Sequence, residues 1–174
     1  MFLLFLTLLS LLSAQLEYAA GQPADISPET AVFAFDMHDV FMNKQESSFI
    51  QETLNIIAEL KQQGYKIYVL SNCARKRYKK LCAKYPSTFN LFDGAYLPSS
   101  DNNYDQKPNP SFYQQFRLYL SSLGHEGCHI IFVDDKQENV LAARVKKFIA
   151  LQFESAEKLK DDIRAMLTKP AYAL

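Results

Sequence analysis

The feature that most limits the fold of this chain is a regular alternation of short apolar segments with longer amphipathic ones. Five short segments have the β-branched and aromatic composition of buried strands: residues 31–35, 66–70, 94–97, 129–133 and 148–153. Five longer segments have apolar residues at helical spacing or helix-end signals: residues 47–64, 74–85, 110–124, 136–147 and 155–168. Because parallel strands need helical crossovers, this alternation predicts an α/β fold: a three-layer parallel sheet with helices on both faces.

The N-terminal segment differs from the rest of the chain. It carries no charge before Glu17, is dense in Leu and Phe, and looks like the apolar region of a secretory signal peptide. We therefore predict that residues 1–20 direct export to the periplasm or the exterior. The alternatives are a membrane-associated or cytoplasmic protein in which this segment is an anchor or a packed helix. Residues 21–30, rich in Pro, Gly, Ser and Asp, predict a linker, and residues 31–170 the folded domain.

Length and charge narrow the choice of partners. A chain of 174 residues, 48% of them hydrophobic, can bury the core of one ordinary domain. Nineteen basic residues balance nineteen acidic ones, so the overall charge gives no sign of a nucleic-acid partner. A charged ligand must therefore be recognised by a local cluster of side chains.

Polar side chains follow the predicted strands at the points where the strands end. Because the carboxyl ends of parallel strands share one edge of a sheet, where ligands bind, we expect these side chains to form one site. The set comprises Asp36, His38 and Asp39 after the first strand, Ser71 and Asn72 after the second, Lys107 after the third, and Asp134 and Asp135 after the fourth.

This combination of residue types suits phosphoryl transfer through a covalent intermediate. A carboxylate at the end of the first strand can act as a nucleophile. A cluster of carboxylates suits Mg²⁺, which prefers oxygen ligands and keeps several waters. A metal ion and a lysine together would neutralise a transferring phosphoryl group, while a serine or asparagine donor would hold its remaining oxygens.

Four segments carry a family resemblance. In order and spacing, "FDMHDVF", "VLSN", "KPNP" and "FVDDKQENVLAA" resemble the four motifs of the haloacid dehalogenase superfamily of hydrolases. The resemblance spans residues 32–153. It implies a Rossmann-like parallel sheet and, as in most members, a Mg²⁺-dependent phosphatase that acts through an aspartyl-phosphate.

The resemblance also implies a role for each motif residue. Asp36 would be the nucleophile, and Lys107 would steady the nucleophile and the phosphate. Ser71, with its neighbour Asn72, would bind the phosphate. The metal would be coordinated by Asp36, by the backbone carbonyl of His38, and by Asp134 and Asp135 as ligands or as support for them.

Residue 38 is where the chain departs from the family pattern. Phosphatases of this superfamily use a DxDx[TV] motif whose second aspartate protonates the leaving group, and His38 occupies that position here. Because histidine titrates near pH 6.5, an imidazole can replace the carboxylic acid as acid and base. Two alternatives stay open: a weak or inactive binding or regulatory module, and a dehalogenase-type hydrolase. The Asp134 and Asp135 pair argues against the second, since dehalogenation needs no metal.

The sequence leaves little room for a cap over the site. Only residues 42–66 separate the first motif from the second strand, which allows a short flap and one helix. We therefore predict an open site that accepts a large phosphorylated substrate or is closed by another copy of the chain. The basic run at residues 75–80 predicts a solvated helix face, of which the first residue or so lies near the ligand.

Overall fold

The computed structural model describes residues 26–45 and 48–168. The predicted export segment, residues 1–20, lies outside the described residues, as do residues 21–25 of the predicted linker. Within the described ranges, no helix has the length and apolar character needed to cross a bilayer.

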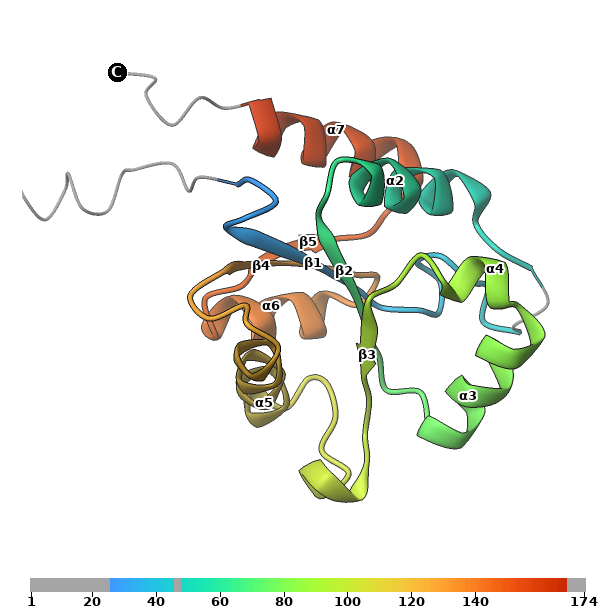
Figure 1. Ribbon diagram of the computed structural model, residues 1–174, viewed down its shortest axis with the longest axis vertical. Helices are drawn as coiled ribbons and strands as arrows, with labels where there is room; N and C mark the ends of the chain where they lie inside the picture. Colours follow the sequence, from blue (N-terminus) through green and yellow to red (C-terminus); the bar gives the residue numbers. More distant parts are fainter. Residues whose placement is uncertain (1–25, 46–47, 169–174) are drawn as a thin grey trace, which may run out of the picture.

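A five-stranded sheet forms the centre of the molecule (Figure 1). Every neighbouring pair of strands is parallel, and the strand order is β3-β2-β1-β4-β5. The predicted α/β fold class is therefore confirmed. The strands are β1 (Ala31–Phe35), β2 (Lys66–Leu70), β3 (Gly94–Tyr96), β4 (His129–Asp134) and β5 (Ile149–Gln152).

Helices cover both faces of the sheet (Figure 1). One face packs against α2 and α7, with α3 and α4 beside them, and the other against α5 and α6. The helices are α2 (Gln51–Gln62), α3 (Arg75–Lys84), α4 (Pro86–Phe89), α5 (Pro110–Ser122), α6 (Gln137–Val145) and α7 (Ala156–Thr168), with a 3₁₀ turn η1 at Ser100–Asn102.

The central strand β1 shows how the sequence pattern fixes the layers. Its side chains alternate between the two faces: Phe33 and Phe35 pack in the cluster under α2 and α7, and Val32 and Ala34 in the cluster under α5 and α6. All five residues of β1 are buried, as expected for a strand covered on both faces. Burial of one phenylalanine contributes about 2 to 3 kcal/mol, so the end of β1 is firmly anchored.

One predicted helix boundary is wrong, for a local reason. The helix predicted from residue 47 begins at Gln51, because Phe49 forms an antiparallel bridge with Met42 and is held outside the helix. The helix predicted over residues 74–85 is α3 and ends at Lys84; Pro86 then begins the short helix α4, which was not predicted, because proline is readily accommodated at the first helical position.

A charge cluster joins α2, β2 and β3 at the edge of the sheet where the strands begin. Asp93 lies 3.1 Å from the ammonium nitrogen of Lys61 and 3.5 Å from that of Lys66, and its Oδ2 accepts a hydrogen bond of 2.9 Å from the Ile67 amide. Burial opposes ionisation of Asp93, but the Ile67 hydrogen bond and the two lysines outweigh it and lower its pKa. We call this group the amino-edge cluster.

Candidate active site

The end of β1 places the predicted nucleophile. The Asp36 amide donates to the Val133 carbonyl of β4 at 2.8 Å, which holds the residue at the carboxyl edge of the sheet. The chain then turns sharply, because Asp39 adopts a left-handed conformation (φ 57°) and its amide donates to the Met42 carbonyl at 2.7 Å. The chain is therefore not extended at Asp39, and this side chain lines the same cavity as His38.

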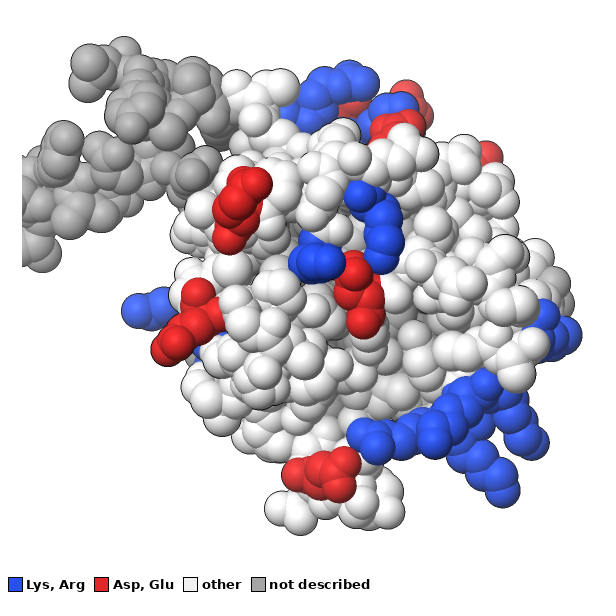
Figure 2. All heavy atoms as spheres, viewed as in Figure 1, with Lys and Arg blue, Asp and Glu red and all other residues white. Residues whose placement is uncertain are grey.

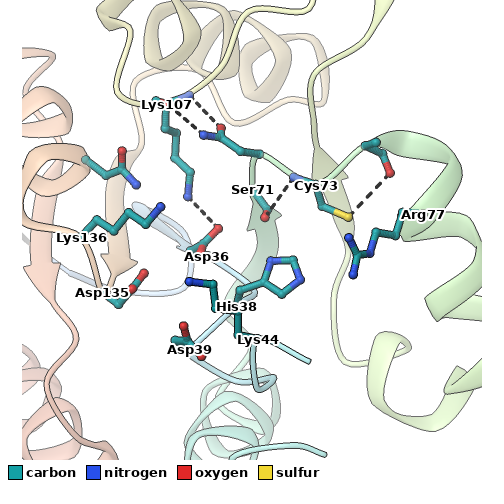
Figure 3. Close-up of a pocket in the computed structure, with 13 residues that line it drawn as sticks. Asp36, His38, Asp39, Lys44, Ser71, Cys73, Arg77, Lys107, Asp135 and Lys136 are labelled. Carbon is teal, nitrogen blue, oxygen red and sulfur yellow. Dashed lines mark hydrogen bonds and ion pairs between the residues drawn. The ribbon is translucent and has the colours of Figure 1, made fainter. Parts of the chain in front are cut away.

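A buried lysine joins two aspartates from neighbouring strands, and Figure 3 shows its contact with the first of them, Asp36. The Lys107 ammonium donates to Asp36 Oδ1 at 2.7 Å and to Asp134 Oδ2 at 2.6 Å. It also lies 5.1 Å from the centre of the Phe132 ring. The Lys107 side chain is only 1% exposed, so its charge depends on these carboxylates for the stabilisation that water would give. We call these three charged residues the carboxyl-edge cluster.

Asn72 fixes the backbone of that lysine. Its side-chain amide donates to the Lys107 carbonyl at 2.8 Å, and its side-chain oxygen accepts from the Lys107 amide at 2.8 Å. These two hydrogen bonds have the pattern of those between neighbouring strands, and they join residues 35 positions apart in the sequence. Asn72 was predicted to bind substrate; it lines the cavity, and these contacts give it a second role in positioning Lys107.

The two adjacent aspartates at the end of β4, Asp134 within the strand and Asp135 after it, have different surroundings. Asp134 is fully buried: its Oδ2 accepts from Lys107, and its Oδ1 from the Lys136 amide and the Asn139 side chain, both at 2.9 Å. Asp135 is half-buried and lines the cavity. Both oxygens of Asp134 are therefore occupied by protein donors, whereas Asp135 can reach a ligand.

Two residues support this arrangement that were not among the predicted site residues. Asn139, at the end of the DDxxxN pattern, holds Asp134. The Tyr113 hydroxyl on α5 donates to the Asn139 carbonyl at 2.9 Å. Burial, followed by the negative charges of Asp134 and Asp36, raises the pKa of Tyr113, which therefore remains a neutral donor. Asn139 lies within the segment "FVDDKQENVLAA", a signal that could have found it, but no local pattern marks Tyr113.

A cavity of about 590 Å³ opens at this edge of the sheet. The structure brings Asp36, His38 and Ser71 to its wall together with Asn72, Lys107 and Asp135, and it leaves Asp134 behind the wall. Ser71 is almost fully buried, and the Cys73 amide donates to its hydroxyl oxygen at 3.4 Å. The lining also contains Asp39, which was expected at this edge of the sheet but was given no role, and residues that were not predicted there: Lys44, Cys73, Ala74, Arg77, Lys136 and Asn139.

The donors on this wall fit a magnesium ion. Among the described residues, no three His, Cys, Asp or Glu side chains are arranged as a metal cage. Mg²⁺ usually binds through one or two carboxylates and keeps its waters, and Asp36 and Asp135 supply two. Burial, followed by the negative charges of Asp134 and Asp36, raises the pKa of Asp135. A divalent cation would relieve the repulsion between these carboxylates.

Comparison with known proteins gives a family and a named relative. Residues 6–145 match the family model of haloacid dehalogenase-like hydrolases. A sesquiterpene phosphatase, astK of Aspergillus oryzae, is 30% identical over 97 residues, which are 56% of this chain and 46% of that protein. The chain thus spans about half the length of this relative.

Solved structures share the fold at low sequence identity. An enzyme of the same superfamily from Bacteroides thetaiotaomicron superposes with a TM-score of 0.59 at 14% identity, covering 78% of this chain and 98% of that one. The hydrolase YfnB of Bacillus subtilis, solved bound to magnesium, superposes with a TM-score of 0.53 at 13% identity, covering 70% and 57%. On the family match and the fold, this chain belongs to the haloacid dehalogenase-like hydrolases.

Proposed function

We propose that the protein is a Mg²⁺-dependent phosphatase that hydrolyses phosphoric monoesters through an aspartyl-phosphate on Asp36. The observation that carries the proposal is the buried Lys107 ammonium, which holds Asp36 at the mouth of the cavity and is itself held by Asp134. A lysine in this position orients the carboxylate for attack and offsets the charge of an incoming phosphoryl group. The phosphatase name of the relative supports the same reaction class.

In the first step, an Asp36 carboxylate oxygen attacks phosphorus, and the bond from phosphorus to the ester oxygen breaks. The Ser71 hydroxyl, at the end of β2, donates a hydrogen bond to a phosphoryl oxygen. His38, two residues beyond the nucleophile and partly exposed in the cavity, gives a proton to the departing oxygen.

In the second step, water attacks the phosphorus of the aspartyl-phosphate. His38 accepts a proton from this water, the bond between phosphorus and the Asp36 oxygen breaks, and orthophosphate leaves. Lys107 stabilises the carboxylate that is restored. One water is consumed, and the alcohol and orthophosphate are the products.

Magnesium would be held by Asp36, Asp135 and the backbone carbonyl of His38, and would supply positive charge for the phosphoryl oxygens. The two cavity-facing carboxylates also argue against a dehalogenase-type reaction, which needs no metal. The site stays accessible, because only residues 42–65, which include α2, separate the first motif from β2. An extended phosphorylated substrate therefore suits this site.

Release of phosphate from p-nitrophenyl phosphate tests the proposal. We expect turnover with Mg²⁺, its loss with excess chelator, and its loss in Asp36→Asn. Asp161→Asn, the same chemical change on the exposed side of α7, is the control and should retain activity. Full activity in Asp36→Asn would refute the covalent mechanism.

His38→Asp separates an active enzyme from a binding or regulatory module. If the imidazole is the acid and base, the substitution lowers turnover and changes its pH profile. If the natural protein is silent and the variant gains activity, the module hypothesis holds instead. Both proteins should show the same thermal unfolding, so that a folding defect is not mistaken for a catalytic one.

A further inference from the structure

Positive side chains surround the cavity beyond the lysine of the carboxyl-edge cluster. Lys44 comes from the loop after β1, Arg77 from α3, and Lys136 from the residue before α6 (Figure 3). Neither the Lys44 nor the Lys136 ammonium has an ion-pair partner among the residues that the structure describes. All three side chains belong to exposed residues on the cavity wall, where a ligand can reach them.

The cations of the lining have different roles in the proposed reaction. Lys107 is committed to Asp36 and Asp134. The charge of Lys136 acts on Asp135, the carboxylate next to it in sequence. Lys44 and Arg77 are left without an assigned function in the reaction of a monoester, and Asp39 is the one remaining carboxylate of the lining.

The cavity wall beside α3 contains no acidic residue. It consists of Cys73 and Ala74, which precede α3, and of Arg77 on α3. Helix α3 has six basic residues and no acidic one, and Figure 2 shows the resulting concentration of Lys and Arg over this part of the surface. The planar guanidinium of Arg77 can bind two oxygens of a phosphate at once, and its positive neighbours would attract a polyanion.

We infer that Arg77 and Lys44 form a subsite for a second phosphate, so that the protein's preferred substrate is a monoester of diphosphate. This inference rests on the proposed function, because it takes Asp36 as the nucleophile. One continuous cavity of about 590 Å³ contains both the nucleophile and the two cations. The terminal phosphate occupies the position next to Asp36, and the inner phosphate that carries the organic group lies toward α3.

The reaction balances with this assignment. An Asp36 oxygen bonds to the terminal phosphorus, and the bridging bond between that phosphorus and the bridging oxygen breaks. The electron pair remains on the bridging oxygen, which leaves as part of the organic monophosphate. Water then releases orthophosphate from Asp36. The leaving group is an anion, and Arg77 and Lys44 stabilise the charge that it gains.

Calorimetric titration of the full chain with inorganic pyrophosphate and with inorganic phosphate tests the subsite directly. With chelator present, we expect pyrophosphate to bind about tenfold more tightly, the effect of one added charge-assisted contact. Arg77→Gln and Lys44→Gln should each reduce this preference. Lys79→Gln removes the same charge from α3 outside the cavity lining and should keep it.

A matched pair of substrates, phenyl diphosphate and phenyl phosphate, tests the same subsite with Mg²⁺. The diphosphate should have the higher kcat/KM, and Arg77→Gln should remove the difference. The subsite is overturned if the two inorganic anions bind equally, even if monoesters are hydrolysed. It is also overturned if Lys79→Gln weakens the preference for pyrophosphate as much as Arg77→Gln does. If pyrophosphate is preferred in a way that depends on Arg77 but neither substrate is hydrolysed, the subsite stands and the proposed hydrolase is refuted.

Discussion

Charge clusters of opposite composition lie at the two edges of the sheet. At the carboxyl edge, one lysine is shared by two aspartates, and its side chain and that of Asp134 are 1% and 0% exposed. At the amino edge, one aspartate is shared by two lysines whose side chains are 36% and 51% exposed. The two clusters use the same chemical groups, but the carboxyl-edge contacts are both more buried and shorter, at 2.6 and 2.7 Å against 3.1 and 3.5 Å.

This difference separates a structural role from a functional one. Around Asp93, water stabilises whatever charge the partners leave uncompensated, and the cluster ties the start of β2 to the start of β3. Around Lys107, protein groups alone must stabilise the charges. Removing these charges from water costs free energy that hydrophobic residues of similar size would avoid. We interpret the carboxyl-edge cluster as one retained for the reaction that it supports.

Removal of the shared lysine should have the largest effect on stability. Lys107→Met leaves two carboxylates uncompensated, and a broken buried pair costs about 3 to 5 kcal/mol. Lys61→Met at the amino edge should cost less than about 1 kcal/mol, because exposed pairs contribute little. Urea denaturation of the two variants measures both free energies of unfolding.

The comparison fails if the two methionine variants lose the same stability. Phosphate release provides a second measure, since Lys107→Met should abolish activity and Lys61→Met should leave it unchanged. Asp36→Asn gives a further test, because it leaves one carboxylate instead of two to pair with the Lys107 ammonium. This variant should unfold no earlier than the natural protein but should lose activity.

The sequence predicted the sheet and the edge that carries these residues. Apolar runs such as residues 31–35 are long enough to identify buried strands, and the rule for parallel strand ends brought Asp36 and Lys107 together. The different contacts of Asp134 and Asp135 could not be predicted, because both residues simply follow a predicted strand in the sequence. Which of them is held by Lys107 depends on the twist of β4 and on the loop before α5.

The contacts of Asn72 lay beyond sequence analysis for a related reason. An asparagine after a strand favours either a turn or a ligand contact. Its pairing with the Lys107 backbone depends on the path of a loop that returns to the site 35 residues later. Side chain to backbone pairs at that separation leave no periodic signal in the sequence.

The second prediction concerns this asparagine. Asn72→Ala removes both hydrogen bonds to the Lys107 backbone, and we expect a loss of about 1 to 3 kcal/mol in the free energy of unfolding. Because the lysine would be less well oriented, kcat should fall more than KM rises. Asn109→Ala, which removes an asparagine cap on α5, is the matched control and should affect stability without this kinetic pattern. A loss of affinity alone would indicate that Asn72 acts chiefly on substrate.

The third prediction uses the pH dependence of the amino-edge cluster. The pKa of Asp93 is lowered in the folded protein, so the unfolded chain binds the proton more readily as the pH falls. The stability that this carboxylate contributes is therefore present above its ordinary pKa of about 3.9 and is lost as the pH falls through the folded value. Asp93→Asn should cost about 1 kcal/mol at neutral pH and nothing in strong acid. A constant difference across the acid range would assign the effect to packing.

The smallest effect should come from the most exposed partner. Lys66 lies 3.5 Å from Asp93 and its side chain is 51% exposed, so Lys66→Gln should change the free energy of unfolding by less than about 0.5 kcal/mol. Raising the salt concentration to about 1 M should remove even this difference, because ions screen exposed charges beyond about 3 Å at that strength. The same salt should change the cost of Lys107→Met much less, since the side chains of Lys107 and Asp134 are 1% and 0% exposed. Equal sensitivity to salt at both edges would mean that exposure does not separate them.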